Sequence, residues 1–391
     1  MDVKRMTQNL TIAVFLLAVF GFSLAFWILP DRDFSEQENR ALRTLPAFTL
    51  EKLASGKFSD EINDYFADQF PIRDALVGVK GFAEIAMGKR ENDGILLGAD
   101  GYLAKRRFDM MLQNGEILPD MDAFDEAHVR DAAEAIRRVS ESLEVPFSVF
   151  LTGRTVDVAA SKLAYPSSYS DALLALLREE LGTMEGYIDS VPLYRERLEN
   201  GEDVYYRTDH HWTSLGAYYA SVAFCNANDI VPYELDTYET VVKTGFMGTL
   251  YGWAGKPASL KENPDYTVAH YPHIGYSMIA GNSGNWYNTS ALNYNYNNYA
   301  GMFINGDNPL TLITSENKNG RTLMIFKESY GNAFVPFMID YFEQIVVVDI
   351  REETKGTGAL IDQYGVTDVI FINNCQAAIS FEEIIRSKAL S

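Results

Sequence analysis

Residues 323–332 have the sequence Leu-Met-Ile-Phe-Lys-Glu-Ser-Tyr-Gly-Asn. The first four are apolar and predict a buried strand, and a helix can begin within residues 332–338. Ser329 would then lie on a turn between strand and helix, with its hydroxyl held out of the fold. Main-chain N–H groups at such a turn can bind an oxyanion. The segment therefore predicts a nucleophilic serine at the end of a buried strand.

A second segment, residues 206–213, has the sequence Tyr-Arg-Thr-Asp-His-His-Trp-Thr. Asp209 and His211 are two residues apart, so a single tight loop would let the carboxylate hold the imidazole. That arrangement fixes the tautomer and leaves Nε2 to accept the proton of Ser329. Serine, histidine and aspartate are the three groups of an acyl-transfer site. The hypothesis requires two segments 118 residues apart to meet in space.

The rest of the C-terminal part predicts alternating helices and strands. Apolar residues at helical spacing predict helices, and apolar runs predict strands: helices over 129–143, 171–181 and 215–226, strands over 146–151, 344–349 and 367–373. Continuous apolar strands favour an α/β fold with a mostly parallel sheet flanked by helices. Ligands of such folds bind beyond the carboxyl ends of the strands. Ser329, Arg351 and Asn373 all fall at or just after a strand end, which predicts a shared cleft.

The first thirty residues predict a membrane anchor. Two basic residues precede an uncharged stretch, 6–30, which is about long enough to cross a bilayer as one helix. The basic flank should stay cytoplasmic, which places the chain from Asp31 onward outside. A cleaved signal peptide is the alternative, because Ser23 and Ala25 are small and the charged start is short. The apolar run continues through 26–29 and favours an uncleaved single-pass anchor.

The remaining sequence suggests a division into two further parts. Residues 31–105 are expected to form a membrane-proximal segment, and residues 106–391 the catalytic domain. Apolar residues at helical spacing between 62 and 70 predict a helix packed on the catalytic body. Residues 94–103 predict a hairpin with an Asp-Gly turn.

Residues 280–308 depart from the α/β pattern and combine several tyrosines and a tryptophan with many asparagines and glycines. Aromatic rings beside amide side chains suit contact with a glycan. A surface insertion that packs its rings locally is an equally good interpretation.

Charge and cysteine content exclude some classes of function. The chain has 33 Lys and Arg against 54 Asp and Glu, a net charge of −21. This acidity argues against nucleic acid or anionic lipid as a ligand of the overall surface. Cys225 and Cys375 lie in apolar surroundings without metal-ligand spacing. They are more simply explained as buried free thiols than as a disulfide.

A metal site is a weaker alternative for the histidine segment. His210 could join Asp209 and His211 as a ligand, with His270 and His273 recruited from farther along the chain. Zinc would need these distant ligands to converge, and the sequence has no His-Glu-x-x-His or paired-cysteine motif. We therefore expect neither a metal nor another cofactor.

Several residues near Ser329 are candidates for an oxyanion or substrate pocket: the main-chain amides of Tyr330 and Gly331, and the side chains of Asn332, Arg351 and Asn373. Arg351 could hold a carboxylate of the substrate or form a structural ion pair. Trp212 is expected to pack and to make the histidine loop rigid.

The segment at 206–213 resembles the signature of the DHHW protein family. Blocks at 34–40, 68–73, 326–332 and 348–351 also resemble that family and occur in the same order. The family is similar to the SGNH-hydrolase-like domains of alginate O-acetyltransferases, which work outside the cytoplasmic membrane. This resemblance implies an SGNH-like α/β fold for the chain.

The resemblance also implies roles for individual residues. Asp209 matches the orienting aspartate, His211 the histidine and Ser329 the nucleophile, whereas His210 falls on a variable position. Two positions depart from the family pattern: Glu328 stands where aspartate is more frequent, and Gly331 where a small residue such as alanine is common.

The implied function is O-acetylation of a cell-envelope or exported polysaccharide through an acetyl-serine intermediate. A membrane-bound partner protein would pass acetyl groups to the extracytoplasmic domain. A carbohydrate acetylesterase with the same three residues is one alternative, and a non-catalytic envelope protein that binds glycans is another.

Overall fold

The computed structural model describes residues 3–35, 40–92, 94–105, 110–111, 117–118, 126–163, 168–282, 285–293, 299–353, 355–380, 382 and 384–385. The chain divides into two compact units. The first comprises Met1–Asn92 and Tyr251–Ser259, and the second comprises Asp93–Leu250 and Leu260–Ser391. Residues 94–105, which we assigned to the membrane-proximal segment, therefore belong to the second unit.

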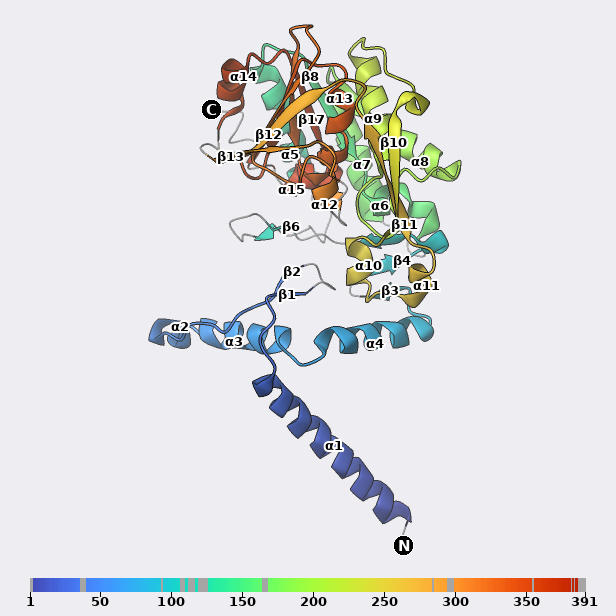
Figure 1. Ribbon diagram of the computed structural model, residues 1–391, viewed down its shortest axis with the longest axis vertical. Coiled ribbons are helices and arrows are strands. Elements are labelled where there is room, and N and C mark those ends of the chain that lie inside the picture. Colours follow the sequence, from blue (N-terminus) through green and yellow to red (C-terminus); the bar gives the residue numbers. More distant parts are fainter. Residues whose placement is uncertain are drawn as a thin grey trace. The chain divides into compact units, whose positions relative to one another are not determined.

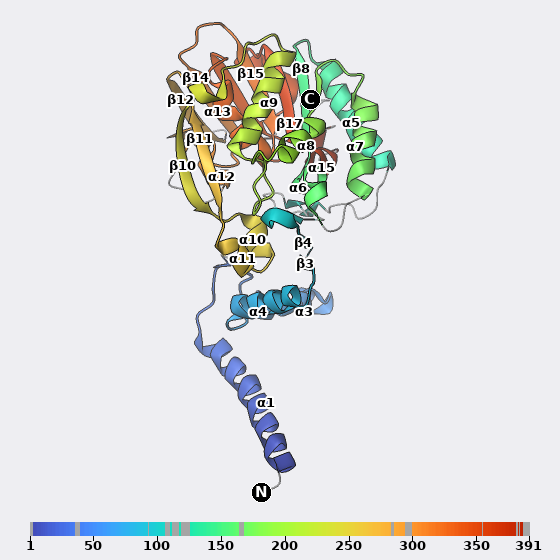
Figure 2. The ribbon, with the colours of Figure 1, turned by 90° about the vertical axis from the view of Figure 1, so that its right-hand side faces the viewer.

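The second unit is built around an eight-stranded sheet with the order β13-β12-β14-β16-β15-β17-β8-β9 (Figures 1 and 2). Its strands are β8 (Phe147–Thr152), β9 (Tyr187–Asp189), β12 (Tyr276–Asn282), β13 (Asn285–Thr289), β14 (Leu310–Ser315), β15 (Thr322–Lys327), β16 (Gln344–Asp349) and β17 (Asp368–Asn374).

The sheet has a parallel half and an antiparallel half. Strands β16, β15, β17, β8 and β9 pair in parallel, whereas β14, β12 and β13 pair antiparallel to their neighbours. The predicted α/β fold with a large sheet flanked by helices is confirmed. The mostly parallel sheet is confirmed only in part, because three of the eight strands are antiparallel. A short connection such as that between β12 and β13 can join only antiparallel strands.

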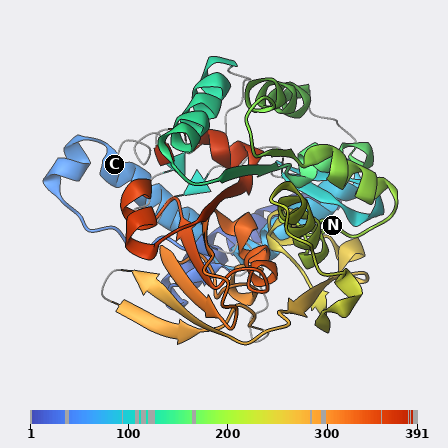
Figure 3. The ribbon, with the colours of Figure 1, turned by 90° about the horizontal axis from the view of Figure 1, so that it is seen from above.

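Helices cover both faces of this sheet (Figure 3). They are α5 (Glu126–Ser142), α6 (Thr155–Val158), α7 (Ser168–Leu181), α8 (Val191–Glu199), α9 (Ser214–Ala227), α12 (Tyr299–Met302), α13 (Val335–Met338), α14 (Thr357–Tyr364) and α15 (Cys375–Ser380). One hydrophobic core lies between the sheet and α5, α7, α14 and α15. The other lies between the sheet and α8, α9, α12 and α13.

The position of the central strand β15 between the two cores explains why its sequence is continuously apolar. Leu323 and Ile325 belong to the core on the α9 side, and Met324 and Phe326 to the core on the α5 side. All four are at most 4% exposed. Burial of each such side chain contributes about 1.5–3 kcal/mol, so both faces of the strand stabilise its position.

Smaller elements complete the second unit. The predicted hairpin is present as β4 (Ile95–Leu97) and β5 (Leu103–Lys105), with a 3₁₀ turn, η1 (Ala99–Gly101), between them. Two further antiparallel pairs are β6 (Met110–Met111) with β7 (Ile117–Leu118), and β10 (Glu239–Phe246) with β11 (Asp265–Tyr271). Three-residue 3₁₀ turns occur at η2 (Ala160–Lys162) and η3 (Leu235–Thr237). Cys225 and Cys375 are both buried and free, as expected.

The first unit begins with the apolar helix α1 (Val3–Ile28). Its stretch Met6–Ile28 has a mean hydropathy of 2.4 and is long and apolar enough to be a membrane span or a signal sequence. The other elements that lie wholly in this unit are β1 (Phe34–Ser35), β2 (Arg40–Ala41), α2 (Leu50–Ala54), α3 (Lys57–Asp68), α4 (Arg73–Ala86) and β3 (Glu91–Asn92). The unit boundaries cut α10 (Thr249–Trp253) and α11 (Ala258–Lys261).

The helix expected between residues 62 and 70 is present as α3, but Phe66 in this helix and Phe70 just after it pack on α1. The rings of Phe26 and Phe66 lie 5.0 Å apart, and those of Phe22 and Phe70 lie 5.2 Å apart. Helical spacing indicated an apolar face correctly. The partner of that face is a long-range property, and here it is the first helix of the chain.

Candidate active site

Ser329 lies just beyond the carboxyl end of the central strand. Strand β15 ends at Lys327, and the 3₁₀ helix η4 (Ser329–Ala333) begins two residues later, followed by α13. The side chain of Ser329 is half-buried, whereas the residues on either side of it are buried. The turn thus presents one hydroxyl toward the surface of an otherwise closed strand end.

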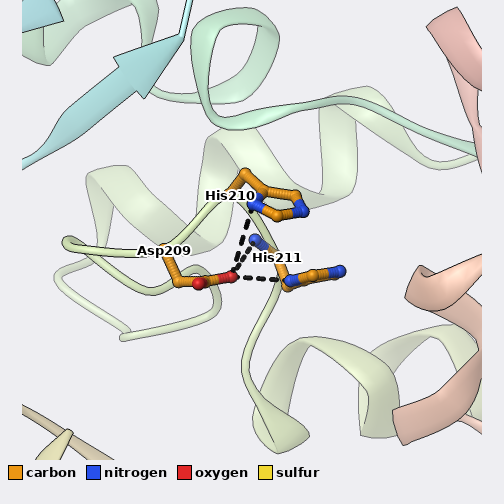
Figure 4. Close-up of side chains that lie close together, drawn as sticks. All are labelled: Asp209, His210 and His211. Carbon is orange, nitrogen blue, oxygen red and sulfur yellow. Dashed lines mark hydrogen bonds and ion pairs between the residues drawn. The ribbon is translucent and has the colours of Figure 1, made fainter. Parts of the chain in front are cut away.

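His211 lies between Ser329 and Asp209. The distance from His211 Nε2 to Ser329 Oγ is 2.8 Å, and the distance from His211 Nδ1 to Asp209 Oδ1 is 2.6 Å. Figure 4 shows the carboxylate of Asp209 aimed at Nδ1 of His211. An ionised carboxylate can accept hydrogen bonds but cannot donate them, so the proton of the imidazole lies on Nδ1. Nε2 is then free to accept the proton of Ser329. The structure therefore brings the two sequence segments together.

A short turn holds the histidine loop in place. Tyr205 and Trp212 form an isolated β-bridge that closes the loop. At its centre, the main-chain N–H and the hydroxyl of Thr208 both donate to Asp265 Oδ2, at 2.8 and 2.5 Å. The loop begins and ends on one bridge and is tied at its middle to β11. Its side chains therefore have little freedom to move.

The environment of Asp209 keeps its carboxylate ionised. Burial is the largest single effect on the pKa of Asp209 and would raise it, whereas charge interactions with His210 and His211 lower it. Hydrogen bonds from the imidazole of His211 and from the Thr249 main-chain N–H (2.8 Å) act in the same direction. The net effect holds the pKa of this carboxyl well below its usual range.

Tyr299 covers one face of His211. The two rings are stacked, with centroids 3.8 Å apart and planes 8° from parallel. The Tyr299 hydroxyl donates to the main-chain oxygen of Tyr330 at 3.1 Å, and Trp212 Nε1 donates to the same oxygen at 2.9 Å. Tyr299 therefore links the histidine loop to the serine turn.

Glu328 is a second possible acceptor for the serine hydroxyl. Its Oε2 lies 3.1 Å from Ser329 Oγ, and its Oε1 accepts from the main-chain N–H of Asn374 at 3.0 Å. Burial raises the pKa of Glu328, although the charges of Arg351 and His211 partly oppose this. The serine has one proton to donate, and the shorter contact is the one to His211.

The predicted oxyanion donors have partners within the protein. The Tyr330 main-chain N–H donates to the Glu328 carboxylate. The Gly331 main-chain N–H donates to the Glu328 carbonyl at 3.0 Å. Asn332 Nδ2 donates to Asp307 Oδ1 at 2.9 Å, and Asn373 Nδ2 donates to the Phe326 carbonyl at 3.2 Å.

Tyr330 and Gly331, which follow Ser329 in the turn, both make close contacts with neighbouring segments. The Tyr330 hydroxyl donates to the main-chain oxygen of His210. A Cβ on Gly331 would lie 2.4 Å from the Cβ of Lys327, so the turn presses directly on the strand. Within the described part of the chain, the Ser329 main-chain N–H makes no hydrogen bond.

A buried ion network lies beside the serine turn. Lys327 Nζ contacts Asp307 Oδ1 at 3.0 Å and Asp349 Oδ2 at 3.1 Å. Arg351 Nη2 contacts Asp349 Oδ2 at 2.6 Å and Asp307 Oδ2 at 2.9 Å. Arg351 therefore forms the structural ion pair that was one of its two predicted roles.

The histidines considered as metal ligands are distributed over separate contacts. Ligand atoms of Asp209, His210 and His211 lie within 4.8 Å of one another. The ring nitrogens of His211 already face Asp209 and Ser329. His270 Nδ1 lies 2.8 Å from Ser214 Oγ, and His273 Nδ1 lies 2.9 Å from Asp340 Oδ2. His211, His270 and His273 therefore each use a ring nitrogen in a hydrogen bond within the protein.

The Tyr/Asn-rich segment, residues 280–308, has some aromatic rings on the surface and one in the interior. Tyr294 and Tyr296, two of the tyrosines of this segment, lie outside the described residues. Trp286 and Tyr287 lie on edge strand β13 and are 38% and 43% exposed. Tyr299 is 3% exposed and packs against His211. The part of the segment nearest the serine is therefore interior.

Sequence reasoning did not assign a role to Lys327, Asp349 or Asp307. A signal was present for two of them, since Lys327 and Asp349 are opposite charges that end two apolar runs. Charged residues at the ends of neighbouring buried strands are well placed to pair. Asp307 carried no comparable signal, because its place next to them depends on the course of the chain before β14.

Comparison with known proteins confirms the family resemblance. Residues 159–348 match the model described as DHHW protein. A DHHW family protein from Eubacterium siraeum is 28% identical, with a TM-score of 0.60. The alignment covers 77% of this chain and 97% of that one. No curated protein matches the chain.

Two other solved structures are similar at lower identity. PatB1 of Bacillus cereus, solved with a sulfonyl adduct, is 17% identical with a TM-score of 0.57, over 73% of this chain and 97% of that one. This likeness concerns the fold alone. The O-acetyltransferase domain of Pseudomonas putida AlgJ is 13% identical with a TM-score of 0.43, over 75% and 99% of the chains.

The buried ion network should contribute strongly to stability. Replacing Lys327 by methionine would leave the buried Asp349 and the partly exposed Asp307 with Arg351 alone. We expect Lys327→Met to lower the free energy of unfolding by about 3–5 kcal/mol, measured by urea unfolding in a mild detergent. Lys318→Met is the control, because Lys318 is 72% exposed where it pairs with Glu343, and it should change little. Equal effects of the two substitutions would contradict this account.

The lowered pKa of His210 predicts that the folded chain loses stability as the pH falls. Burial and the neighbouring charge of His211 lower the pKa of His210 to about 3. An unfolded histidine binds a proton below about pH 6.5. Protonation between these values therefore favours the unfolded chain, and stability is lost as the pH falls.

The variant His210→Gln should lose less stability on acidification. Between pH 7 and pH 4.5 we expect its loss to be smaller than that of the unsubstituted chain by about 1–2 kcal/mol. Urea unfolding at both pH values measures the difference. Parallel losses in the two proteins would show that His210 is not held neutral by the fold.

Proposed function

From the match of residues 159–348 to the DHHW family and the contact of Ser329 with His211, we propose that the chain is an O-acetyltransferase of SGNH-like fold. It would transfer acetyl groups to hydroxyls of a cell-envelope or exported polysaccharide. The single observation that carries the proposal is the continuous contact from Asp209 through His211 to Ser329, at 2.6 and 2.8 Å. This is the arrangement that activates a serine hydroxyl.

The first half of the reaction forms an acetyl-serine. His211 Nε2 takes the proton of Ser329 as Oγ attacks the carbonyl carbon of an acetyl ester. The bond from that carbon to the donor oxygen breaks, and the departing oxygen takes the proton from His211.

In the second half, His211 takes the proton of a sugar hydroxyl, whose oxygen attacks the acetyl carbon. Ser329 Oγ leaves and recovers the proton, so the site returns to its starting state.

The surroundings of His211 support this role. The ionised Asp209 would stabilise the imidazolium that forms in each half, and the stack with Tyr299 would keep the ring in plane with both partners. The Ser329 main-chain N–H is the donor we propose for the tetrahedral oxyanion, because it makes no hydrogen bond within the described residues.

The proposed location requires a source of acetyl groups. With α1 as an uncleaved anchor, the second unit would be extracytoplasmic, whereas acetyl-CoA is cytoplasmic. A membrane-bound partner protein would therefore carry acetyl groups across.

The same residues would also serve an acetylesterase, in which water replaces the sugar hydroxyl. A non-catalytic glycan-binding role is a second alternative, which the exposed rings of Trp286 and Tyr287 would suit.

Ser329→Ala should abolish acetyl transfer while leaving the fold and any simple glycan binding intact. We expect the hydrolysis of an aryl acetate to fall by about 10⁴-fold or more, and covalent labelling by a serine-reactive phosphonate to disappear. Ser59→Ala removes an exposed serine of α3 and serves as the control. Acetylated oligosaccharide detected by mass spectrometry supports the transferase, and hydrolysis that no oligosaccharide alters supports the esterase. Full activity of Ser329→Ala would disprove the nucleophile.

Tyr299 should matter chiefly through its ring. Tyr299→Phe keeps the stack on His211 and loses the two hydrogen bonds of the hydroxyl, one from Trp212 Nε1 and one to the Tyr330 carbonyl. Trp212 Nε1 still donates to the Tyr330 carbonyl, so we expect at most about a fivefold loss of kcat. Tyr299→Leu removes the stack as well, and we expect about a 10- to 100-fold loss of kcat with little change in KM. Steady-state kinetics on the aryl acetate distinguish the two. If the leucine variant matched the phenylalanine variant, the stack would have no catalytic value.

A further inference from the structure

Helix α4 exposes a continuous apolar stripe. Within α4 (Arg73–Ala86), Leu76, Val79 and Ala83 follow each other at intervals of three and four residues and share one face of the helix. The N-cap Ile72, whose backbone is left-handed, and the C-cap Met87 extend this apolar stripe at the two ends of the helix. The four large side chains among them are 41–79% exposed. A stripe of this length on a helix normally faces a protein core or a membrane.

The opposite face of α4 already has a partner within the first unit. A Cβ on Gly81 would lie 2.8 Å from Asn92 Nδ2, and one on Gly78 would lie 3.9 Å from the Gly255 carbonyl. Asn92 Nδ2 in turn donates to the Ala254 carbonyl at 2.9 Å. At 100° per residue, Gly78 and Gly81 lie about half a turn from the stripe. The stripe is thus exposed on a helix that is held in place from behind.

The start of α4 lies close to the apolar helix α1. Phe70 packs on Phe22, which is six residues before the end of α1 and so about 9 Å along the helix from Ile28. Ile72, the first residue of the stripe, is two residues after Phe70 and at most about 7 Å farther along the chain. If α1 crosses a membrane, α4 begins at the level of its outer boundary.

The charge of this segment differs from that of the chain. Residues 72–90 contain four basic residues, Arg73, Lys80, Lys89 and Arg90, against two acidic ones, Asp74 and Glu84. The local charge of +2 contrasts with −21 for the whole chain. The acidity that excludes anionic lipid from the overall surface therefore does not apply to α4. Basic residues beside an apolar stripe are typical of helices that lie in a membrane surface.

We propose that α4 lies in the plane of the membrane surface, with its apolar stripe inserted at the boundary between headgroups and acyl chains. The occupant of the stripe is the lipid bilayer. A second copy of the chain is a poorer partner, because it would bring the same basic residues together. A single spanning helix can rotate about its own axis, and this second contact would fix the orientation of the first unit.

The proposal requires α1 to span the membrane and does not depend on the chemistry of Ser329. It can be tested on the full chain, reconstituted in vesicles of phosphatidylcholine and phosphatidylglycerol. Single cysteines at Val79 and Met87 carry a nitroxide label on the stripe. Val242→Cys on β10 is the matched control, since Val79 is 66% exposed and Val242 57%. Leu17→Cys reports on α1. The native cysteines are buried, so the label goes to the introduced residue.

The measurement compares collision of each label with oxygen, which concentrates in lipid, and with a water-soluble nickel chelate. We expect the labels at 79 and 87 to resemble the one at 17, with several-fold lower accessibility to the nickel chelate than the label at 242. Labels at 79 and 87 that behave like the one at 242 would overturn the proposal. Exclusion of both reagents at 79 and 87 would also overturn it, because a protein surface would then occupy the stripe.

Two further controls keep the outcomes distinct. A water-exposed label at 17 would remove the premise that α1 is inserted and would overturn the proposal with it. Phosphonate labelling of Ser329 in each variant should equal that of the unsubstituted chain. A failure of the membrane contact is thereby separated from a failure of the proposed acetyl chemistry.

Discussion

The position of Ser329 depends on a group of two cations and two carboxylates, of which Lys327 and Asp349 are buried and Arg351 and Asp307 are partly exposed. Lys327 ends the central strand, Asp349 ends its neighbour, and Arg351 and Asp307 complete the set at distances of 2.6–3.1 Å. Each charge removed from water is costly unless it is compensated, and here every one contacts two of opposite sign. Any displacement of the strand end would break several of these contacts at once. Ser329 is two residues beyond Lys327, so these contacts also restrict its position.

The histidine side of the site is fixed by different interactions. Nδ1 of His211 faces an ionised carboxylate, Nε2 faces the serine, and a tyrosine ring covers one face. The loop that carries His211 is closed by the Tyr205–Trp212 bridge and tied to Asp265. Polar contacts thus set the direction of the ring, and aromatic packing sets its plane.

The antiparallel half of the sheet has a functional consequence. It brings the chain before β14 back across the end of β16, where the Asp349 main-chain N–H donates to the Pro309 carbonyl at 3.1 Å. That return places Asp307 beside Lys327 and Arg351, and it carries Tyr299 to His211. The segment that looks like an insertion in the sequence therefore supplies two of the contacts that hold the site, while Trp286 and Tyr287 remain on the outer edge.

The sequence by itself determined the local features: the apolar run of β15, the serine that follows it, the two-residue spacing of Asp209 and His211, and the apolar first helix. Such features follow from the burial and turn preferences of consecutive residues, which a pattern records directly. Only the tertiary structure decided that His211 meets Ser329, that Arg351 pairs with Asp349 and Asp307, that the amides of Asn332 and Asn373 bond within the protein, and that Tyr299 stacks on the imidazole. Each of these depends on which strand lies beside which and on how a distant segment returns. Pairings of that kind are set by the packing of the whole core, because no residue in a local window encodes the identity of its partner.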